Sequence, residues 1–195
     1  MARTLLRVFL LTLSVASAGF AQQAPAWEFF GGYSLERSVV REYYKSTPII
    51  YTFRERYVNL NGWEASLTEN VNHWFGGTLQ TTGHYKSPVF SGTKSRQQMF
   101  TLLYGPRLSK RMGGATVFGH VLFGASRVSV TVSPGPHDSQ TSFAVAGGGG
   151  LDLNIASRVA VRVLQLQYSP MNPIATKNHK FQASAGIVLN VGKTK

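Results

Sequence analysis

Serine and histidine are the residue types in this chain that could support covalent catalysis. A hydrolase needs a serine hydroxyl activated by a histidine, which a carboxylate orients in turn. The candidates are His84, His120, His179, Ser126 and Ser184. No serine and histidine share a face at a spacing that implies contact, so the sequence predicts no enzymatic activity.

Metal and cofactor chemistry are not indicated either. The chain has no cysteine, which excludes thiolate metal sites and disulfides. Its five histidines are too dispersed for a metal site. The glycines at 147–150 lack the Lys-Ser/Thr ending and the following helix of a phosphate-binding loop. Glycines in a strand mark a close approach of backbones or a bend, so we expect no metal and no cofactor.

The elements that must carry the polar residues are strands. In residues 181–191 an apolar face alternates with a face of small and polar residues, and a tilted strand of about ten residues is long enough to cross a bilayer. Eight segments alternate in this way: 27–37, 58–69, 74–85, 98–109, 115–130, 143–155, 159–168 and 181–191. The fifth is ambiguous in face, because Phe118 and Leu122 share a side with His120. The seventh loses its parity at Gln165, and a bulge near Leu164 would restore it.

The connections between these segments alternate in length. Those at 70–73, 110–114 and 156–158 are short, whereas those at 38–57, 86–97, 131–142 and 169–179 are long and proline-containing. This asymmetry is typical of an outer-membrane barrel. A soluble lipocalin-like barrel is the alternative, but it would bury the aromatic face around a ligand. The pattern predicts an all-β fold, an eight-stranded antiparallel up-and-down transmembrane β-barrel that is monomeric.

The first 21 residues have the parts of a secretory signal peptide. Arg3 and Arg7 precede or flank a short apolar run, and small residues follow it. Cleavage fits after Ala18 or after Ala21, and we prefer Ala21. A membrane anchor is the alternative, but the apolar run is shorter than the about 20 residues of a spanning helix. We expect a signal peptide at 1–21 and one barrel domain at 22–195.

Five charged residues fall on the polar faces of the segments. They are Glu28, Glu64, Arg107, Asp152 and Arg162. An eight-stranded barrel is just wide enough for side chains to fill it, and an unpaired buried charge costs several kcal/mol. We therefore predict a barrel-interior polar network that plugs the lumen. The alternative is a gated narrow pore.

The net charge of +12 raises the question of a nucleic acid partner. The charges are scattered over expected loops and form no stripe, and an exported chain rarely meets nucleic acid, so we expect none. The loop from Ser38 to Tyr57 combines arginines with tyrosines, which suits an anionic sugar or phosphate at a surface. The alternative is a solvated loop above the lipid head groups.

Several stretches resemble one known family. They are Phe30-Gly31-Gly32-Tyr33-Ser34, the residues 59–66 and the residues 147–152. Together they are similar to the small bacterial outer-membrane β-barrel domain proteins of the opacity and OmpA-transmembrane type. The resemblance implies location in the bacterial outer membrane, contact with its lipid, and a structural or adhesion-like role. It also admits a narrow porin-like channel and, third, a lipid A-modifying barrel enzyme.

The last segment resembles the signal by which the outer-membrane assembly machinery recognises its clients. The matching positions are Ser184, Gly186, Leu189 and Val191. The family prefers aromatic residues at the hydrophobic positions and a terminal Phe. This chain has aliphatic residues there and continues for four residues. The same strand is expected to close the barrel by pairing with residues 27–37.

Overall fold

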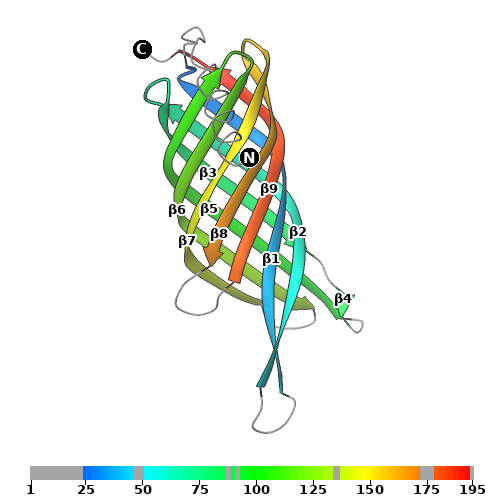
Figure 1. The fold of residues 1–195 in the computed structure, drawn as a ribbon. Helices are drawn as coiled ribbons and strands as arrows, with labels where there is room; N and C mark the ends of the chain where they lie inside the picture. The colour runs from blue at the N-terminus through cyan, green and yellow to red at the C-terminus, as the bar shows by residue number, and fades with distance from the viewer. Residues whose placement is uncertain are drawn as a thin grey trace, which may run out of the picture.

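The computed structural model describes residues 24–45, 51–86, 89–90, 93–133, 137–171 and 178–193. These residues form one sheet that closes into a barrel (Figure 1). Its wall consists of β1 (Trp27–Lys45), β2 (Tyr51–Asn70), β3 (Phe75–Lys86), β5 (Thr93–Met112), β6 (Ala115–Ser133), β7 (His137–Ala156), β8 (Val159–Met171) and β9 (Asn178–Val191). The two-residue strand β4 (Val89–Phe90) pairs with β5 beside the wall.

Closure of the barrel follows from two pairings. The strands run in the order β3-β2-β1-β9-β8-β7-β6-β5, and β3 pairs with β5 to complete the circle. Every one of these neighbours is antiparallel. The first and last strands meet as expected, with Trp27 opposite Val191 and Arg37 opposite Phe181. The predicted eight-stranded antiparallel barrel is confirmed.

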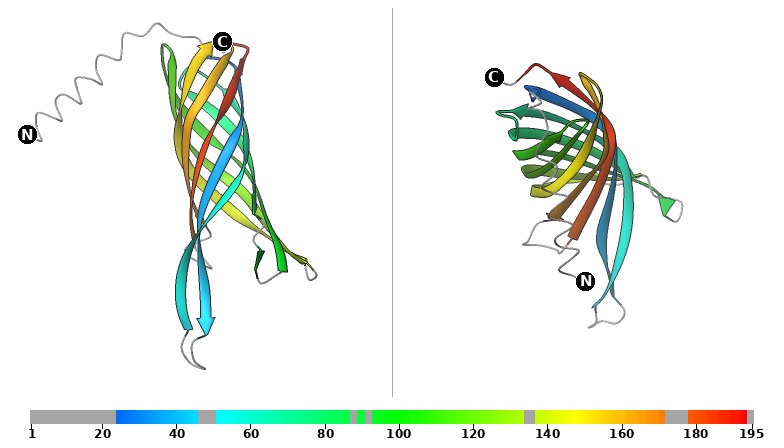
Figure 2. Two further views of the ribbon diagram at one scale, coloured as in Figure 1. Left: turned by 90° about the vertical axis from the view of Figure 1, so that its right-hand side faces the viewer. Right: turned by 45° about the horizontal axis from the view of Figure 1, so that its top comes forward.

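The two rims of the barrel differ. At the short-turn rim, turns at 71–74, 113–114 and 157–158 connect the strands. Gly113 has a φ of 53°, a conformation that glycine adopts without steric cost. At the opposite rim, here called the hairpin rim, β1 and β2 extend together well beyond the wall (Figures 1 and 2).

The prediction of a long loop from Ser38 to Tyr57 is wrong. β1 and β2 stay paired from Ser38 opposite Val58 to Lys45 opposite Tyr51, so most of that segment is a strand hairpin. The β-branched and aromatic residues along it favour extended backbone. The expected loops at 86–97 and 131–142 are shortened in the same way, because β5 begins at Thr93 and β7 at His137.

Outside the bulges, side chains alternate between the two faces of the wall. The outer face is apolar and exposes large side chains such as Tyr33, Tyr104 and Ile187. The inner face is mostly polar, with small apolar clusters around Phe30 and Leu103. The fold thus inverts the usual arrangement of a soluble protein.

The structure determines which side chains point inward in the two segments where the alternation was ambiguous, 115–130 and 159–168. In β6, Phe118, His120 and Leu122 point inward and are buried. In β8 the register shifts between Arg162 and Gln165, and the two residues between them are both about half exposed. The bulge expected near Leu164 is therefore confirmed.

No helix within the described ranges is long and apolar enough to cross a membrane. The segment 1–21, expected to be a signal peptide, lies outside the described residues.

Candidate functional site: a charged network inside the barrel

The network begins near the short-turn rim, at Glu28 of β1. Its carboxylate lies 2.9 Å from Nη2 of Arg107 and 2.6 Å from Nη2 of Arg111, both on β5. Asn70 donates a hydrogen bond to the same carboxylate at 3.0 Å. Glu28 and Arg107 are almost fully buried, so charge pairing compensates their loss of hydration.

Asp152 of β7 joins two arginines in the middle of the lumen. Arg162 of β8 donates to both of its carboxylate oxygens, at 2.7 and 3.1 Å, in the bidentate geometry that suits a guanidinium. Arg107 donates to it more weakly, at 3.4 Å. Asp152 therefore links the Glu28 cluster on β1 and β5 to β8.

Glu64 of β2 continues the network without a direct cationic partner. Gln165 donates to one carboxylate oxygen at 2.7 Å, while Gln182 and Ser184 donate to the other at 2.7 and 2.5 Å. Gln165 also accepts a hydrogen bond from Arg162 at 2.7 Å, which connects Glu64 to the arginine cluster. The structure thus brings all five predicted interior residues into one connected set.

The network ends toward the hairpin rim in a cluster of Ser34, Glu36, His84 and Lys180. The Oγ of Ser34 lies 3.0 Å from Nε2 of His84, and Nδ1 of His84 lies 3.6 Å from a carboxylate oxygen of Glu36. Lys180 pairs with the other oxygen of Glu36 at 3.4 Å and donates to the sulfur of Met99.

The expectation that no serine and histidine meet is therefore wrong for one pair. Ser34 and His84 lie on β1 and β3, which flank β2, and they meet over Gly62, the β2 residue that pairs with both of them. Their arrangement with Glu36 has the order of a catalytic triad, but 3.6 Å is too long for a hydrogen bond. Ser34 and His84 are both fully buried, which leaves the serine no access to a substrate.

Aromatic rings fill the space between the arginines. The guanidinium of Arg162 lies over the rings of Phe30 and Phe118, 4.2 and 4.4 Å from their centroids. Arg107 lies 3.9 Å from the centroid of Phe118. These distances fit cation–π contacts, so rings and guanidinium groups together occupy the cross-section of the barrel.

Inward-facing glycines make room for these rings. A Cβ on Gly150 would lie 2.7 Å from the ring of Phe118, and a Cβ on Gly32 would lie 2.8 Å from the ring of Phe30. In the glycine run at 147–150, Gly150 therefore serves the packing of the lumen, and Gly148 and Gly149 permit the close approach of backbones that the sequence predicts.

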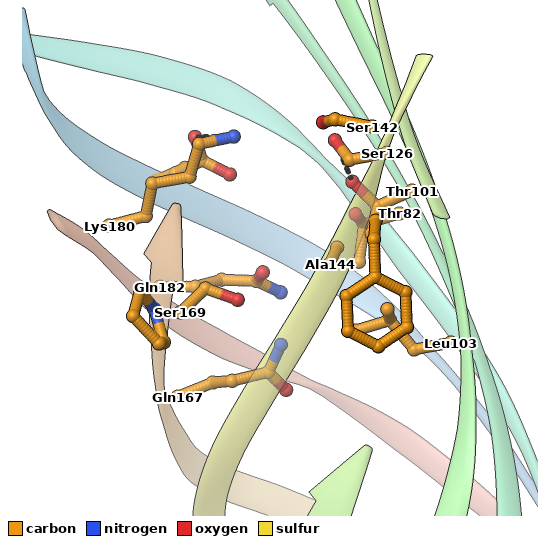
Figure 3. A pocket seen from close by; sticks show the side chains of 13 residues that line it. Thr82, Thr101, Leu103, Ser126, Ser142, Ala144, Gln167, Ser169, Lys180 and Gln182 are labelled. Carbon is orange, nitrogen blue, oxygen red and sulfur yellow. Dashed lines mark hydrogen bonds and ion pairs between the residues drawn. The ribbon is translucent and has the colours of Figure 1, made fainter. Parts of the chain in front are cut away.

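Cavities remain at both ends of the network. A cavity of about 660 Å³ opens at the short-turn rim beside Glu28, Arg111 and Asp152. A much smaller one of about 30 Å³ lies toward the hairpin rim. Figure 3 shows the polar side chains that converge on it, among them Thr82, Thr101, Ser126, Ser142, Ser169 and Lys180.

The sequence pattern missed three charged members of the network. Arg111 and Lys180 lie just beyond the segments 98–109 and 181–191, and Glu36 shares the inward parity of Glu28. Continuing the alternation past the expected strand ends would have found Arg111 and Lys180, whereas Glu36 already stood on the polar face of the segment 27–37. Including them, the buried network contains four carboxylates and four cations, and is balanced in charge.

The residues of the predicted assembly signal lie on β9. Ser184 points inward and belongs to the network, whereas Leu189 and Val191 are half exposed on the outer face. A Cβ on Gly186 would lie 2.3 Å from the carbonyl oxygen of Gly31, so this glycine permits the close approach of β1.

Among the described residues no group of histidine, aspartate or glutamate side chains could hold a metal ion.

A closed eight-stranded barrel with an apolar outer face and a polar interior is the fold of small outer-membrane proteins. No family model and no curated protein matches the chain. Three solved structures illustrate the likeness. Neisserial surface protein A (NspA) is 11% identical, with 87% of this chain and 99% of that chain covered and a TM-score of 0.64.

The other two structures come from Yersinia pestis and Pseudomonas aeruginosa. The attachment invasion locus protein Ail of Y. pestis, in complex with the heparin analogue sucrose octasulfate, is 13% identical, covers 84% of this chain and 97% of its own, and has a TM-score of 0.57. The outer membrane protein OprG of P. aeruginosa is 12% identical, covers 88% and 98%, and has a TM-score of 0.55. At such identities the likeness establishes the fold.

Proposed function

We propose that the chain is a monomeric integral protein of the bacterial outer membrane with a structural or surface-interaction role and no enzymatic activity. The single observation that carries the proposal is the inversion of the fold. Large apolar side chains cover the outer face, while charged residues are buried and paired inside. Lipid is the surrounding that such an outer face requires.

The fold class of the solved structures supports the same location. The signal peptide expected at 1–21 would supply export, and β9 would supply the signal for the assembly machinery. Outer-membrane barrels have short turns on the periplasmic side and longer connections on the outer side. The short-turn rim therefore faces the periplasm, and the hairpin rim faces the cell exterior.

The charged network makes the barrel a closed body instead of a channel. Between the two cavities, Arg107, Asp152, Arg162 and Glu64 link strands from opposite sides of the lumen. A bilayer holding the wild-type protein should show no steady conductance. Well-resolved, reproducible channels in that bilayer would favour the alternative of a narrow porin-like pore.

A matched pair of variants makes this test specific. Arg162→Ala removes the guanidinium that spans the lumen and should open a path for ions. Arg127→Ala removes an exposed arginine on the outer face of β6 and should produce no conductance across the bilayer. Equal conductance of the two variants would refute the assignment of the plug.

The hairpin of β1 and β2 is the proposed surface for an anionic ligand. The stretch from Ser38 to Tyr57 contains four basic and two acidic residues. At its base the guanidinium of Arg37 lies 4.5 Å from the ring centroid of Tyr57, a combination suited to sulfated or phosphorylated sugars. The complex of Ail with a heparin analogue supports this class of ligand.

Heparin retention tests the surface role separately from the location. The triple variant Arg41→Gln/Arg54→Gln/Arg56→Gln should elute from a heparin column at clearly lower salt than the wild type. A loss of charge outside the hairpin, Lys110→Gln/Arg127→Gln, removes exposed cations of the outer face and should change elution much less, charge for charge. Equal shifts would mean that net charge, and not the hairpin, governs retention.

A further inference from the structure

The cavity at the short-turn rim is large enough for a ligand, and the proposed role does not use it. Its volume of about 660 Å³ falls within the range of roughly 300–1,000 Å³ for small-molecule sites. β7, β8 and β9 and the turn at 157–158 supply most of its wall. The cavity, here called the vestibule, is open on one side and ends at the charged network on the other.

Positive charge is in excess in the vestibule. Two carboxylates line it, those of Glu28 and Asp152, and both are already engaged by arginines of the network. Beyond Arg111, the further cations of its lining are Arg158 and Lys193. Neither has an ion-pair partner within the described part of the chain.

The cations beneath the vestibule increase this imbalance. Arg107 and Arg162 do not line the vestibule, but both bind Asp152 from the adjoining network. Counting these two with the lining, five cations accompany two carboxylates. Toward the hairpin rim the network is different, because Glu36 and Glu64 outnumber Lys180 there. The field of the lumen is therefore polarised, with its positive end at the vestibule.

Hydrogen-bond donors accompany this charge. The side-chain amide of Asn190 lines the vestibule, as do the hydroxyls of Thr116 and Ser157. Basic groups and neutral donors around a concave space are the combination that recognises oxyanions. The alternative is that these cations are ordinary solvated charges of the rim. Such charges would lie on the outer face, as Lys110 does.

We infer that the vestibule binds a small anion of the carboxylate or phosphate class, which enters from the short-turn side. Arg158 and Lys193 supply the ion pairs, and the donors beside them fix the orientation. The inference is independent of the ligand proposed for the hairpin, which lies at the opposite rim.

Citrate and inorganic phosphate are suitable probes for the barrel refolded in detergent micelles. Backbone amide shifts measured by NMR should saturate with the bound anion and concentrate at Arg158, Asn190 and Lys193. Citrate binding alone would identify the carboxylate class, and phosphate binding alone the phosphate class. Glycerol, which is polar and uncharged, should produce no saturable shift.

Two variants decide whether the vestibule is responsible. Arg158→Gln/Lys193→Gln should weaken binding of the active probe about fivefold or more, because each exposed ion pair contributes roughly 0.5 kcal/mol. Lys110→Gln removes a charge from the outer face of the same rim and should leave affinity unchanged. Retention of the heat-modifiable gel mobility would show that both variants are folded. Absence of saturable shifts with both probes, or equal affinity of the double variant and the wild type, would overturn the inference.

Discussion

Replacing Asp152 with asparagine removes the carboxylate that pairs with Arg162 while keeping the size of the side chain. Within the described residues Arg162 has no other ion-pair partner, and it is 1% exposed. Arg107 loses a contact of 3.4 Å but keeps Glu28 at 2.9 Å. The main effect is therefore one buried guanidinium without a counter-ion.

Breaking a buried pair by removal of one partner costs about 3–5 kcal/mol. Asp152 borders the water-accessible vestibule, and Arg162 retains Gln165 and two aromatic rings. We therefore expect a loss near the lower end of that range, about 3 kcal/mol in the free energy of unfolding. The double variant Asp152→Asn/Arg162→Met should recover about 2 kcal/mol, since it leaves no orphaned charge.

Urea unfolding in phospholipid vesicles, followed by tryptophan fluorescence, measures these differences. Glu69→Gln is the matched control, because Glu69 is an exposed carboxylate on the outer face of β2 near the same rim. It should change stability by less than about 0.5 kcal/mol. A loss below about 1 kcal/mol for Asp152→Asn, or no recovery in the double variant, would refute the reasoning that the pair is buried and closes the lumen.

Three further predictions follow from the packing and from the sequence. Gly150→Ala should lower the free energy of unfolding by about 1–3 kcal/mol, because the added Cβ would meet the ring of Phe118. Gly147→Ala should leave stability unchanged, because nothing lies within 4 Å of its Cβ. Urea unfolding compares the two variants, and equal losses would count against this packing. A fluorophosphonate reagent should not label Ser34 in the folded protein. A stoichiometric adduct on Ser34 found by mass spectrometry would support enzymatic activity. The mature protein from the outer membrane should begin at Gln22 by intact mass, and a mass that includes residues 1–21 would refute cleavage.

The alternation of the sequence was sufficient to predict the wall of the barrel. Its period of two is fixed by the pleat, so the eight segments, the pairing of residues 27–37 with 181–191 and the bulge near Leu164 could all be derived. The ends of the strands could not. Prolines and charges at the hairpin rim suggested loops, but strand pairing continues past the membrane-length segments up to Lys45 and Tyr51.

The members of the charged network were partly predictable, and their partners were not. Inward parity identifies Glu28 or Arg162 as interior residues. Which of them meet depends on the stagger of strands around the closed barrel. The register of β1, β2 and β3 brings Ser34 to His84 over Gly62, and the stagger places three neutral donors around Glu64. Neither contact has a signal in the spacing of residues along the chain.

Electrophoresis of the outer-membrane fraction with and without boiling tests the central claim most directly. A closed barrel that spans the membrane should be recovered in that fraction, and unheated samples should migrate differently from boiled ones. Recovery of the protein in the soluble periplasm, with one mobility in both samples, would contradict the membrane barrel and its proposed location together.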